Sequence, residues 1–268
     1  MSQHEYNDDT ISKPIAIASP SENMTSLKST LPEVPSEHDI EKRKALRDQS
    51  KRWPNATVPY ELHGDFSETQ RQSIRTAMEH FHNHTCIRFV EHSDEVDYLK
   101  ITLGDENWSE VGRRGGDQLM SLSPYGCLEL RVVLHELMHT LGFLHEHSRP
   151  DRRSYVTIKW RNILTDRKPE FKKWNESFVD LLNTTYNYSS IMHYGAFAFS
   201  TNTARKTIAT NVESPELGRH NKLSDKDVLR LRMYYNCVWL RFDKTQSSRV
   251  PYCEYQTFAT IVAARHHA

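Results

Sequence analysis

Apolar residues recur along part of the chain at the spacing of an α-helix. After Ser67 they follow one another at intervals of three and four residues, which places them on one helical face. Ser67 and Gln70 also have the spacing of a capping box, the usual start of a helix. We therefore expect a core-facing helix after Ser67, with its apolar face formed by Ile74, Ala77, Met78 and Phe81.

A second helix is expected over residues 224–236. Ser224 occupies its cap position and Asp227 the third helical position, again as in a capping box. Val228, Leu231 and Tyr235 then share one face.

Short segments rich in β-branched and aromatic residues predict strands before and between these helices. They cover residues 57–62, 86–91, 98–103, 118–123 and 155–160. Residues 161–222 show few clear periodicities, so we expect a mainly irregular second lobe there.

Composition narrows the class of protein. The chain has 268 residues, of which 37% are hydrophobic and 26% charged, which fits one soluble domain with extensions. The formal net charge is zero and there is no basic block, so neither nucleic acid nor an anionic membrane is expected as a partner. No apolar segment approaches the roughly 18 residues of a membrane span. The first ten residues are polar and acidic, and no signal peptide is visible.

The strongest chemical signal is the spacing HExxHxxGxxH between His135 and His145. His135 and His139 are four residues apart, so on a helix both imidazoles can bind one metal ion. His145 joins them only if the helix ends first, and Gly142 is suited to end it because glycine adopts a left-handed C-cap easily. Three neutral imidazoles predict a Zn²⁺ site with an open fourth position, as in catalytic sites. His147 is an alternative third ligand, although it is two residues late for the spacing.

Glu136 follows the first histidine and points about 100° away from it around the helix. This position suits a general base beside the metal better than a fourth ligand. A short HExxH can also arise by chance on a helix in a chain with 15 histidines. The glycine and the third histidine at fixed offsets make chance a poor explanation.

These residues resemble the astacin family of zinc endopeptidases, a branch of the metzincins. Glu146 after the third histidine suggests this branch, and SIMHYG provides Met192 as the family's Met-turn residue. The resemblance implies that Tyr194 stabilises the oxyanion during hydrolysis. It also implies an α+β, two-lobed domain. The N-terminal lobe would have a small twisted mixed sheet and two long helices, and the C-terminal lobe would be mostly irregular with one helix.

The same resemblance divides the chain into three parts. Residues 1–44 would be a largely disordered pro-segment, 45–237 the protease domain and 238–268 a tail. In the family, a pro-segment aspartate blocks the zinc, and the nearest match here is Asp39, although a solvated acid in a disordered tail explains it about as well. Removal of the pro-segment near Lys44 would let the new amino terminus approach Glu146.

The resemblance further implies protein or peptide substrates. The segment SEVGRRGGDQLMSL matches the family's loop and the strand at the edge of the active-site cleft, which would bind an extended substrate by strand addition. The matching positions are Val111, Gly112, Arg113, Gly115, Gly116 and Gln118.

The cysteines match the family in part. Cys86 and Cys237 match the pair that links the two lobes, which favours an oxidising, secreted location. Cys127 matches one half of a second bridge, but Asn107 stands where its partner is expected. Cys127 is therefore free or pairs with Cys253.

Arg131 is a departure from the family, which has glycine four residues before the first zinc histidine. Residues 131, 135 and 139 lie on one helical stripe, so the guanidinium is expected one turn from the metal. Alternatively the side chain extends into solvent or meets Glu129.

The sequence thus predicts a secreted, zinc-dependent endopeptidase. The alternative is a zinc-retaining inactive relative that binds protein partners through its cleft. Arg131 and the missing bridge favour this alternative, whereas the intact Glu136 and Tyr194 oppose it. A purely structural zinc module is a third interpretation, and the open three-histidine site disfavours it.

Overall fold

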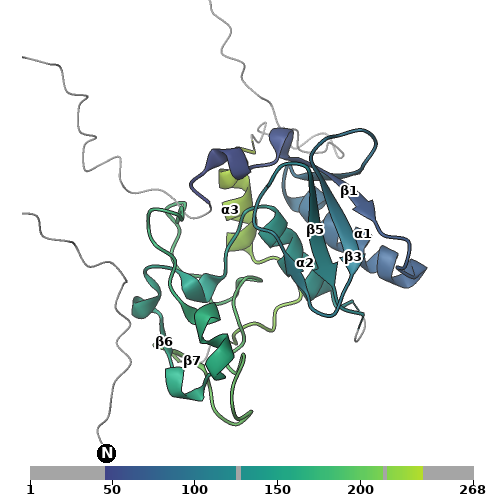
Figure 1. Cartoon of the computed structure of the whole chain (residues 1–268). Helices are drawn as coiled ribbons and strands as arrows, with labels where there is room; N and C mark the ends of the chain where they lie inside the picture. The colour runs from purple at the N-terminus through teal and green to yellow at the C-terminus, as the bar shows by residue number, and fades with distance from the viewer. Residues whose placement is uncertain (1–45, 125–127, 214–215, 238–268) are drawn as a thin grey trace, which may run out of the picture. The chain divides into compact units, whose positions relative to one another are not determined.

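A five-stranded mixed sheet forms the first part of the fold (Figure 1). The computed structural model describes residues 46–124, 128–213 and 216–237. The strand order is β2-β1-β3-β5-β4, in which only β4 runs antiparallel to its neighbour. The strands are β1 (Thr57–Leu62), β2 (Arg88–Glu91), β3 (Tyr98–Leu103), β4 (Trp108–Ser109) and β5 (Asp117–Leu122).

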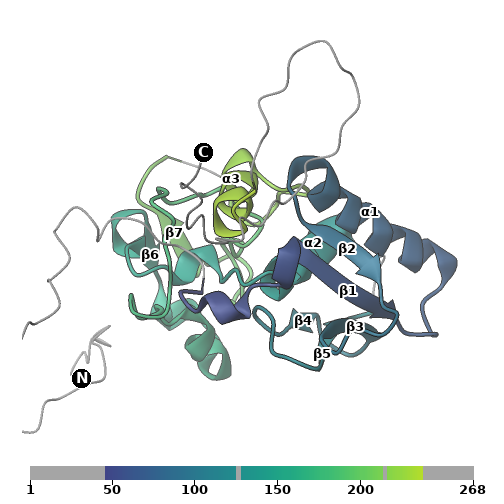
Figure 2. The same cartoon turned by 90° about the horizontal axis from the view of Figure 1, so that it is seen from above.

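Two helices lie behind this sheet in Figure 1 and are seen from above in Figure 2: α1 (Glu68–His84) and α2 (Leu130–Thr140). The capping box of Ser67 and Gln70 is present at the start of α1. All four residues expected on its apolar face are buried, so the predicted helix and its face are confirmed.

The chain after α2 contains little regular structure, as the sequence indicates. Two strands, β6 (Val156–Ile158) and β7 (Ile208–Thr210), pair antiparallel, and α3 (Asp225–Tyr234) follows with the predicted capping box of Ser224 and Asp227. The sequence does not predict strand β7, which lies within residues 161–222, where the sequence shows few clear periodicities. Short 3₁₀ helices span Gln49–Lys51, Pro54–Ala56, Glu146–Ser148, Arg152–Ser154, Trp160–Asn162 and Thr165–Phe171.

The structure corrects the expected edge of the sheet. The segment containing Gln118 is not the edge strand, because β5 lies between β3 and β4 and Gln118 is buried. Its side chain accepts a hydrogen bond from the Arg114 amide and donates one to the Gly112 carbonyl, which holds the preceding loop. The edge is instead the two-residue strand β4, in which Trp108 pairs with Ser121.

Two hydrophobic clusters fill the described part of the chain. The larger one lies between the sheet, α1 and α2, and α3 adds Val228, Leu231 and Tyr234 to it. The smaller cluster is built around Val156, Phe171 and other residues after α2. The architecture confirms the expected α+β class, but the helix expected in the second lobe buries its apolar face in the first core.

One disulfide, Cys86–Cys237, joins the end of α1 to the residues after α3. It spans 151 residues of sequence and has a Cα–Cα distance of 5.4 Å, within the usual range of disulfides. The expected Cys86–Cys237 pairing is thus present. Cys127, Cys253 and Asp39 lie outside the described residues.

Loss of this bridge should weaken folding strongly, because closing so long a loop restricts the unfolded chain. The chain-entropy relation gives about 5 kcal/mol for a loop of this length, which for a domain of this size lowers Tm by about 10–20 °C. We expect this result for the double variant Cys86→Ser/Cys237→Ser in thermal unfolding, with the reduced native protein as the control. Peptide mapping without reductant should join the Cys86 and Cys237 peptides, and a Cys86–Cys127 link would contradict the assignment.

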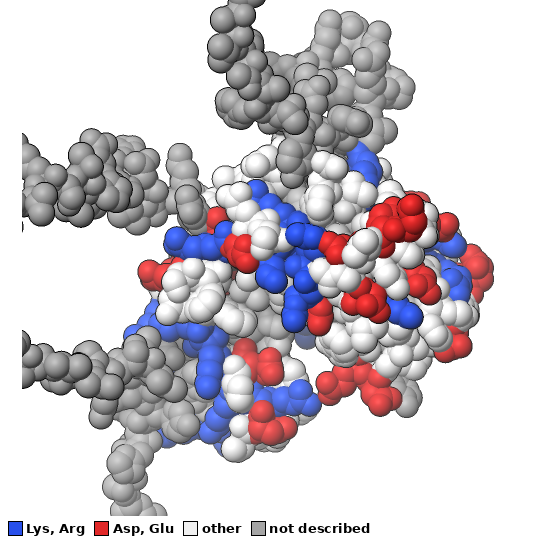
Figure 3. All heavy atoms as spheres, turned by 45° about the horizontal axis from the view of Figure 1, so that its top comes forward, with Lys and Arg blue, Asp and Glu red and all other residues white. Residues whose placement is uncertain are grey.

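Charges of both signs share the surface. On the face shown in Figure 3, Lys and Arg side chains lie beside Asp and Glu side chains, in keeping with a formal net charge of zero. In the described ranges, no helix has both the length and the apolarity needed to cross a bilayer.

Candidate metal centre

Helix α2 ends where the histidine spacing requires it to end. Gly142 has a φ of 96°, which is the left-handed conformation that glycine adopts at little cost. Its amide donates to the His139 carbonyl, and the Phe143 amide donates to the Met138 carbonyl, as in a Schellman motif. The chain therefore turns back, and the predicted role of Gly142 is confirmed.

This turn brings three imidazoles together. The Nε2 atom of His145 lies 3.1 Å from the Nε2 atoms of both His135 and His139. Among the described residues, these three form the one group of His, Cys, Asp or Glu side chains with ligand atoms close enough to hold a metal ion, all within 4.8 Å of one another.

Backbone carbonyls determine which ring nitrogens face the centre. His135 Nδ1 lies 2.8 Å from the Ile191 carbonyl, and His139 Nδ1 lies 2.8 Å from the Phe143 carbonyl. A carbonyl only accepts, so each Nδ1 carries the proton and each Nε2 presents a lone pair. Such second hydrogen bonds are typical of histidines that bind metals.

Burial keeps these imidazoles neutral. It lowers the pKa of His139 to about 3 and the pKa of His145 well below its ordinary value. The pKa of His135 is lowered mainly by burial, while its bond to Ile191 raises it and the charge of Arg131 lowers it. Neutral imidazole is the form that binds metal, so the three residues fit a zinc ion by donor type, convergence and protonation.

Glu136 lies beside this group and is 5% exposed. Its Oε2 atom is buried without a hydrogen-bond partner among the described residues. Burial raises the pKa of Glu136 to about 8. A buried carboxyl oxygen without a protein partner is costly unless a proton, a water molecule or a substrate group meets it, so this oxygen is available for chemistry at the site.

Met192 and Tyr194 come from a later segment that packs against the turn after α2. Met192 is buried, and its carbonyl accepts a hydrogen bond from the Glu146 amide. The Tyr194 ring lies 4.4 Å from the His145 ring between centroids, and burial raises the pKa of its hydroxyl. The hydroxyl is therefore protonated at neutral pH and able to donate a hydrogen bond.

His147, the alternative third ligand, is not part of the group. It is fully buried, and its Nε2 lies 3.0 Å from the Glu170 carbonyl. Its ring stacks on Tyr194 with centroids 4.1 Å apart. His147 therefore packs against Tyr194, whereas His145 is the third histidine of the metal centre.

A buried network next to the histidines is not predicted by the sequence. Glu146 forms ion pairs with Arg149 at 3.3 Å and Arg230 at 2.8 Å, and it accepts a hydrogen bond from the Asn187 amide. All three charged side chains are at most 2% exposed. Glu146 therefore shares its two cations with other carboxylates, because Arg149 also pairs with Asp151 at 2.6 Å and Arg230 lies 3.9 Å from Asp227.

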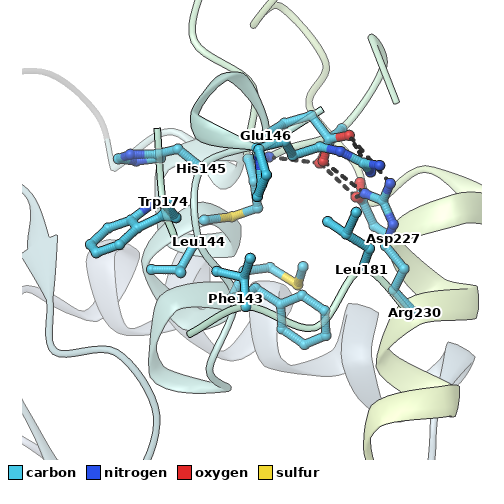
Figure 4. Close-up of a pocket in the computed structure, with 14 residues that line it drawn as sticks. Phe143, Leu144, His145, Glu146, Trp174, Leu181, Asp227 and Arg230 are labelled. Carbon is cyan, nitrogen blue, oxygen red and sulfur yellow. Dashed lines mark hydrogen bonds and ion pairs between the residues drawn. The ribbon is translucent and has the colours of Figure 1, made fainter. Parts of the chain in front are cut away.

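These ion pairs line one side of a small cavity (Figure 4). Asp227 and Arg230 enter it from α3, while Phe143, Leu144 and Trp174 supply apolar walls. Asp227 also accepts a hydrogen bond from the Ile191 amide, and the Ile191 carbonyl holds His135. The sequence marks Asp227 only as a helix-capping residue, so its link to His135 is visible in the tertiary structure alone.

Arg131 lies at the start of α2 and is exposed. It meets Glu129, as one of the two alternatives expected, with Arg131 Nε 2.7 Å from Glu129 Oε2. It also reaches the Gly218 carbonyl at 3.3 Å.

The chain matches one family over most of its described length. The peptidase family described as Astacin matches residues 45–236. The chain is 38% identical over 197 residues to zinc metalloproteinase nas-4 of Caenorhabditis elegans, covering 73% of this chain and 62% of that protein. It is 41% identical over 182 residues to High choriolytic enzyme 2 of Oryzias latipes, covering 67% and 64% respectively. The chain thus spans less than two thirds of the length of these relatives.

A solved structure has the same fold. High choriolytic enzyme 1 of Oryzias latipes, described as a hatching enzyme zinc-protease, superposes with a TM-score of 0.69 at 37% identity. The match covers 72% of this chain and all of that one.

Proposed function

The chain belongs to the astacin family of peptidases, and from this premise we propose that it is a zinc-dependent endopeptidase that hydrolyses protein substrates. The observation that carries the proposal is the convergence of His135, His139 and His145 beside a buried carboxyl group. The three Nε2 atoms would hold one Zn²⁺ ion. The ion, when bound, makes water more acidic and polarises a carbonyl group.

Glu136 would act as the general base. It takes a proton from the attacking water and delivers it to the nitrogen of the leaving amine. Its Oε2 atom, which has no hydrogen-bond partner among the described residues, supports this role, because no protein group competes for the proton. Tyr194 would donate a hydrogen bond from its hydroxyl to the oxyanion that forms on the substrate.

An extended peptide would bind along strand β4, the short edge of the sheet. Trp108 pairs with Ser121 on one side, which leaves the other side of β4 without a strand partner in the part of the chain that the structure describes. Strand addition at such an edge presents a peptide in extended form.

Metal content measured together with peptide cleavage tests the proposal. The protein should carry about one zinc per chain and cleave a mixed peptide library, and removing the metal with a chelator should abolish cleavage. Restoring zinc should restore it. Zinc binding with no cleavage of any peptide would favour the inactive, protein-binding alternative.

We further propose secretion and activation by loss of residues 1–44. Relatives named as hatching enzymes and the Cys86–Cys237 bridge support an oxidising location. If the pro-segment blocks the zinc, a protein beginning at Ala45 should be more active than the full chain. Equal activity of the full chain and the protein beginning at Ala45 in the same cleavage assay would contradict the proposal that residues 1–44 inhibit the enzyme. The division at residues 44 and 237 rests on the sequence and the family match.

A further inference from the structure

The two parts of the fold carry opposite net charge. Residues 54–124, which contain the five-stranded sheet and α1, hold twelve Asp and Glu against six Lys and Arg. Residues 152–206, in the irregular part of the chain after α2, hold ten Lys and Arg against four Asp and Glu. The formal net charge of zero therefore hides an acidic first part and a basic later part of the same chain.

Four of these cations flank one end of the ladder that β6 and β7 form (Figure 1). They follow β6 or precede β7, and we call them the basic cluster: Lys159, Arg161, Arg205 and Lys206. The Lys159 amide donates to the Thr207 carbonyl at 2.8 Å, and the Asn162 side chain donates to the Lys206 carbonyl at 2.7 Å. These bonds hold two segments of the chain side by side, although Asn162 and Lys206 are 44 residues apart in sequence.

The basic cluster has no anionic partner in the described part of the chain. All four of its residues are exposed, and none of their side chains forms a hydrogen bond or an ion pair with another described residue. Other cations of the same region differ, since Arg152 is buried and Arg167 pairs with Glu106 and Asp166. Like charges held together repel one another, so folding alone gives no reason to gather these four cations.

We propose that the basic cluster binds a sulfated polysaccharide. Sulfate groups are anionic at every physiological pH, and their oxygens accept charge-assisted hydrogen bonds from Lys and Arg. A linear polyanion offers several such groups to the four cations at once, and the counterions that it releases favour binding. The Cys86–Cys237 bridge favours an oxidising, extracellular location, where sulfated polysaccharides are more abundant than nucleic acids.

Titration of the protein with heparin, a sulfated polysaccharide, at several salt concentrations tests the proposal. The native protein should bind at low salt and be released as salt rises. The double variants Lys159→Gln/Arg161→Gln and Arg205→Gln/Lys206→Gln should each weaken binding about tenfold. Each should also reduce the slope of log Kd against log salt concentration by about two, because each removes two cations. Both variants are needed, since the proposal requires both segments to contact the polysaccharide.

The matched control is Arg75→Gln/Lys222→Gln, which changes the net charge by the same amount outside the basic cluster. Arg75 lies on α1 in an exposed ion pair with Glu68, and Lys222 is exposed before α3. This variant should bind heparin as the native protein does. An equal loss of binding in the control and in the cluster variants would overturn the proposal, because net charge and not the cluster would then hold the polysaccharide.

Two other probes identify the chemistry that is recognised. Desulfated heparin should bind far more weakly than heparin, and single-stranded DNA of similar length should bind no more tightly than heparin. Tighter binding to the DNA would favour nucleic acid as the partner and overturn the proposal. A native protein that binds no heparin at low salt, or cluster variants that bind it unchanged, would overturn it as well.

The inference does not depend on the proposed peptidase function. Glu136→Ala should bind heparin as the native protein does, so binding is measured even if no peptide is cleaved. The cluster variants should keep the zinc content and unfolding temperature of the native protein, because their side chains are exposed and without partners among the described residues. Weaker heparin binding in variants that stay folded therefore reports on the surface itself.

Discussion

Replacing Glu136 by alanine is expected to lower the rate of peptide hydrolysis by about 10² to 10⁴-fold, the usual contribution of a general acid–base group. The substitution leaves all three histidines and the Nδ1 hydrogen bonds of His135 and His139 in place, so about one zinc per chain should remain. Glu136 Oε2 has no hydrogen-bond partner in the described structure, so folding does not depend on a bond from that atom. The measurements are kcat/KM on a cleavable peptide and zinc content on the same sample.

Two further variants make this result specific. Glu136→Gln keeps the shape of the side chain but removes the base, so its activity should fall about as far as that of the alanine variant. Glu79→Gln, an exposed glutamate on α1, should leave activity unchanged. Near-native hydrolysis by Glu136→Gln would show that another group moves the proton.

Replacing His139 by alanine should remove metal and activity together. His139 is buried with its Nδ1 held by the Phe143 carbonyl, so no neighbouring group replaces its Nε2 lone pair in the described site. Two imidazoles hold zinc poorly, and we expect affinity to fall more than about 100-fold. Zinc titration by competition with a chromophoric chelator measures this loss, and cleavage should become undetectable at limiting zinc.

His147 provides the matched control for this variant. It is as deeply buried as His139, but its Nε2 contacts the Glu170 carbonyl and it stacks on Tyr194. His147→Gln should therefore keep zinc, whatever happens to turnover. Loss of zinc in His147→Gln, with zinc retained in His145→Ala, would show that His147 and not His145 is the third ligand.

The sequence alone determined those features in which one segment contains both partners of an interaction. The caps at Ser67 and Ser224 are predicted correctly because they join residues three apart. The histidine spacing and Gly142 belong to one helix and its turn, so their geometry follows from 3.6 residues per turn. The α+β class was implied by the family resemblance, and the structure confirms it.

Tertiary structure alone decided which distant segments meet. Trp108 is at the sheet edge and Gln118 inside it because strand order depends on long-range pairing, which a local pattern does not encode. The pairing of Glu146 with Arg230 spans 84 residues, and the link from Asp227 through Ile191 to His135 joins three segments. The sequence around these charged and polar side chains does not tell whether they are buried or exposed to solvent. Burial in the folded chain selects its partner, because an unpaired charge or polar group inside a protein is costly.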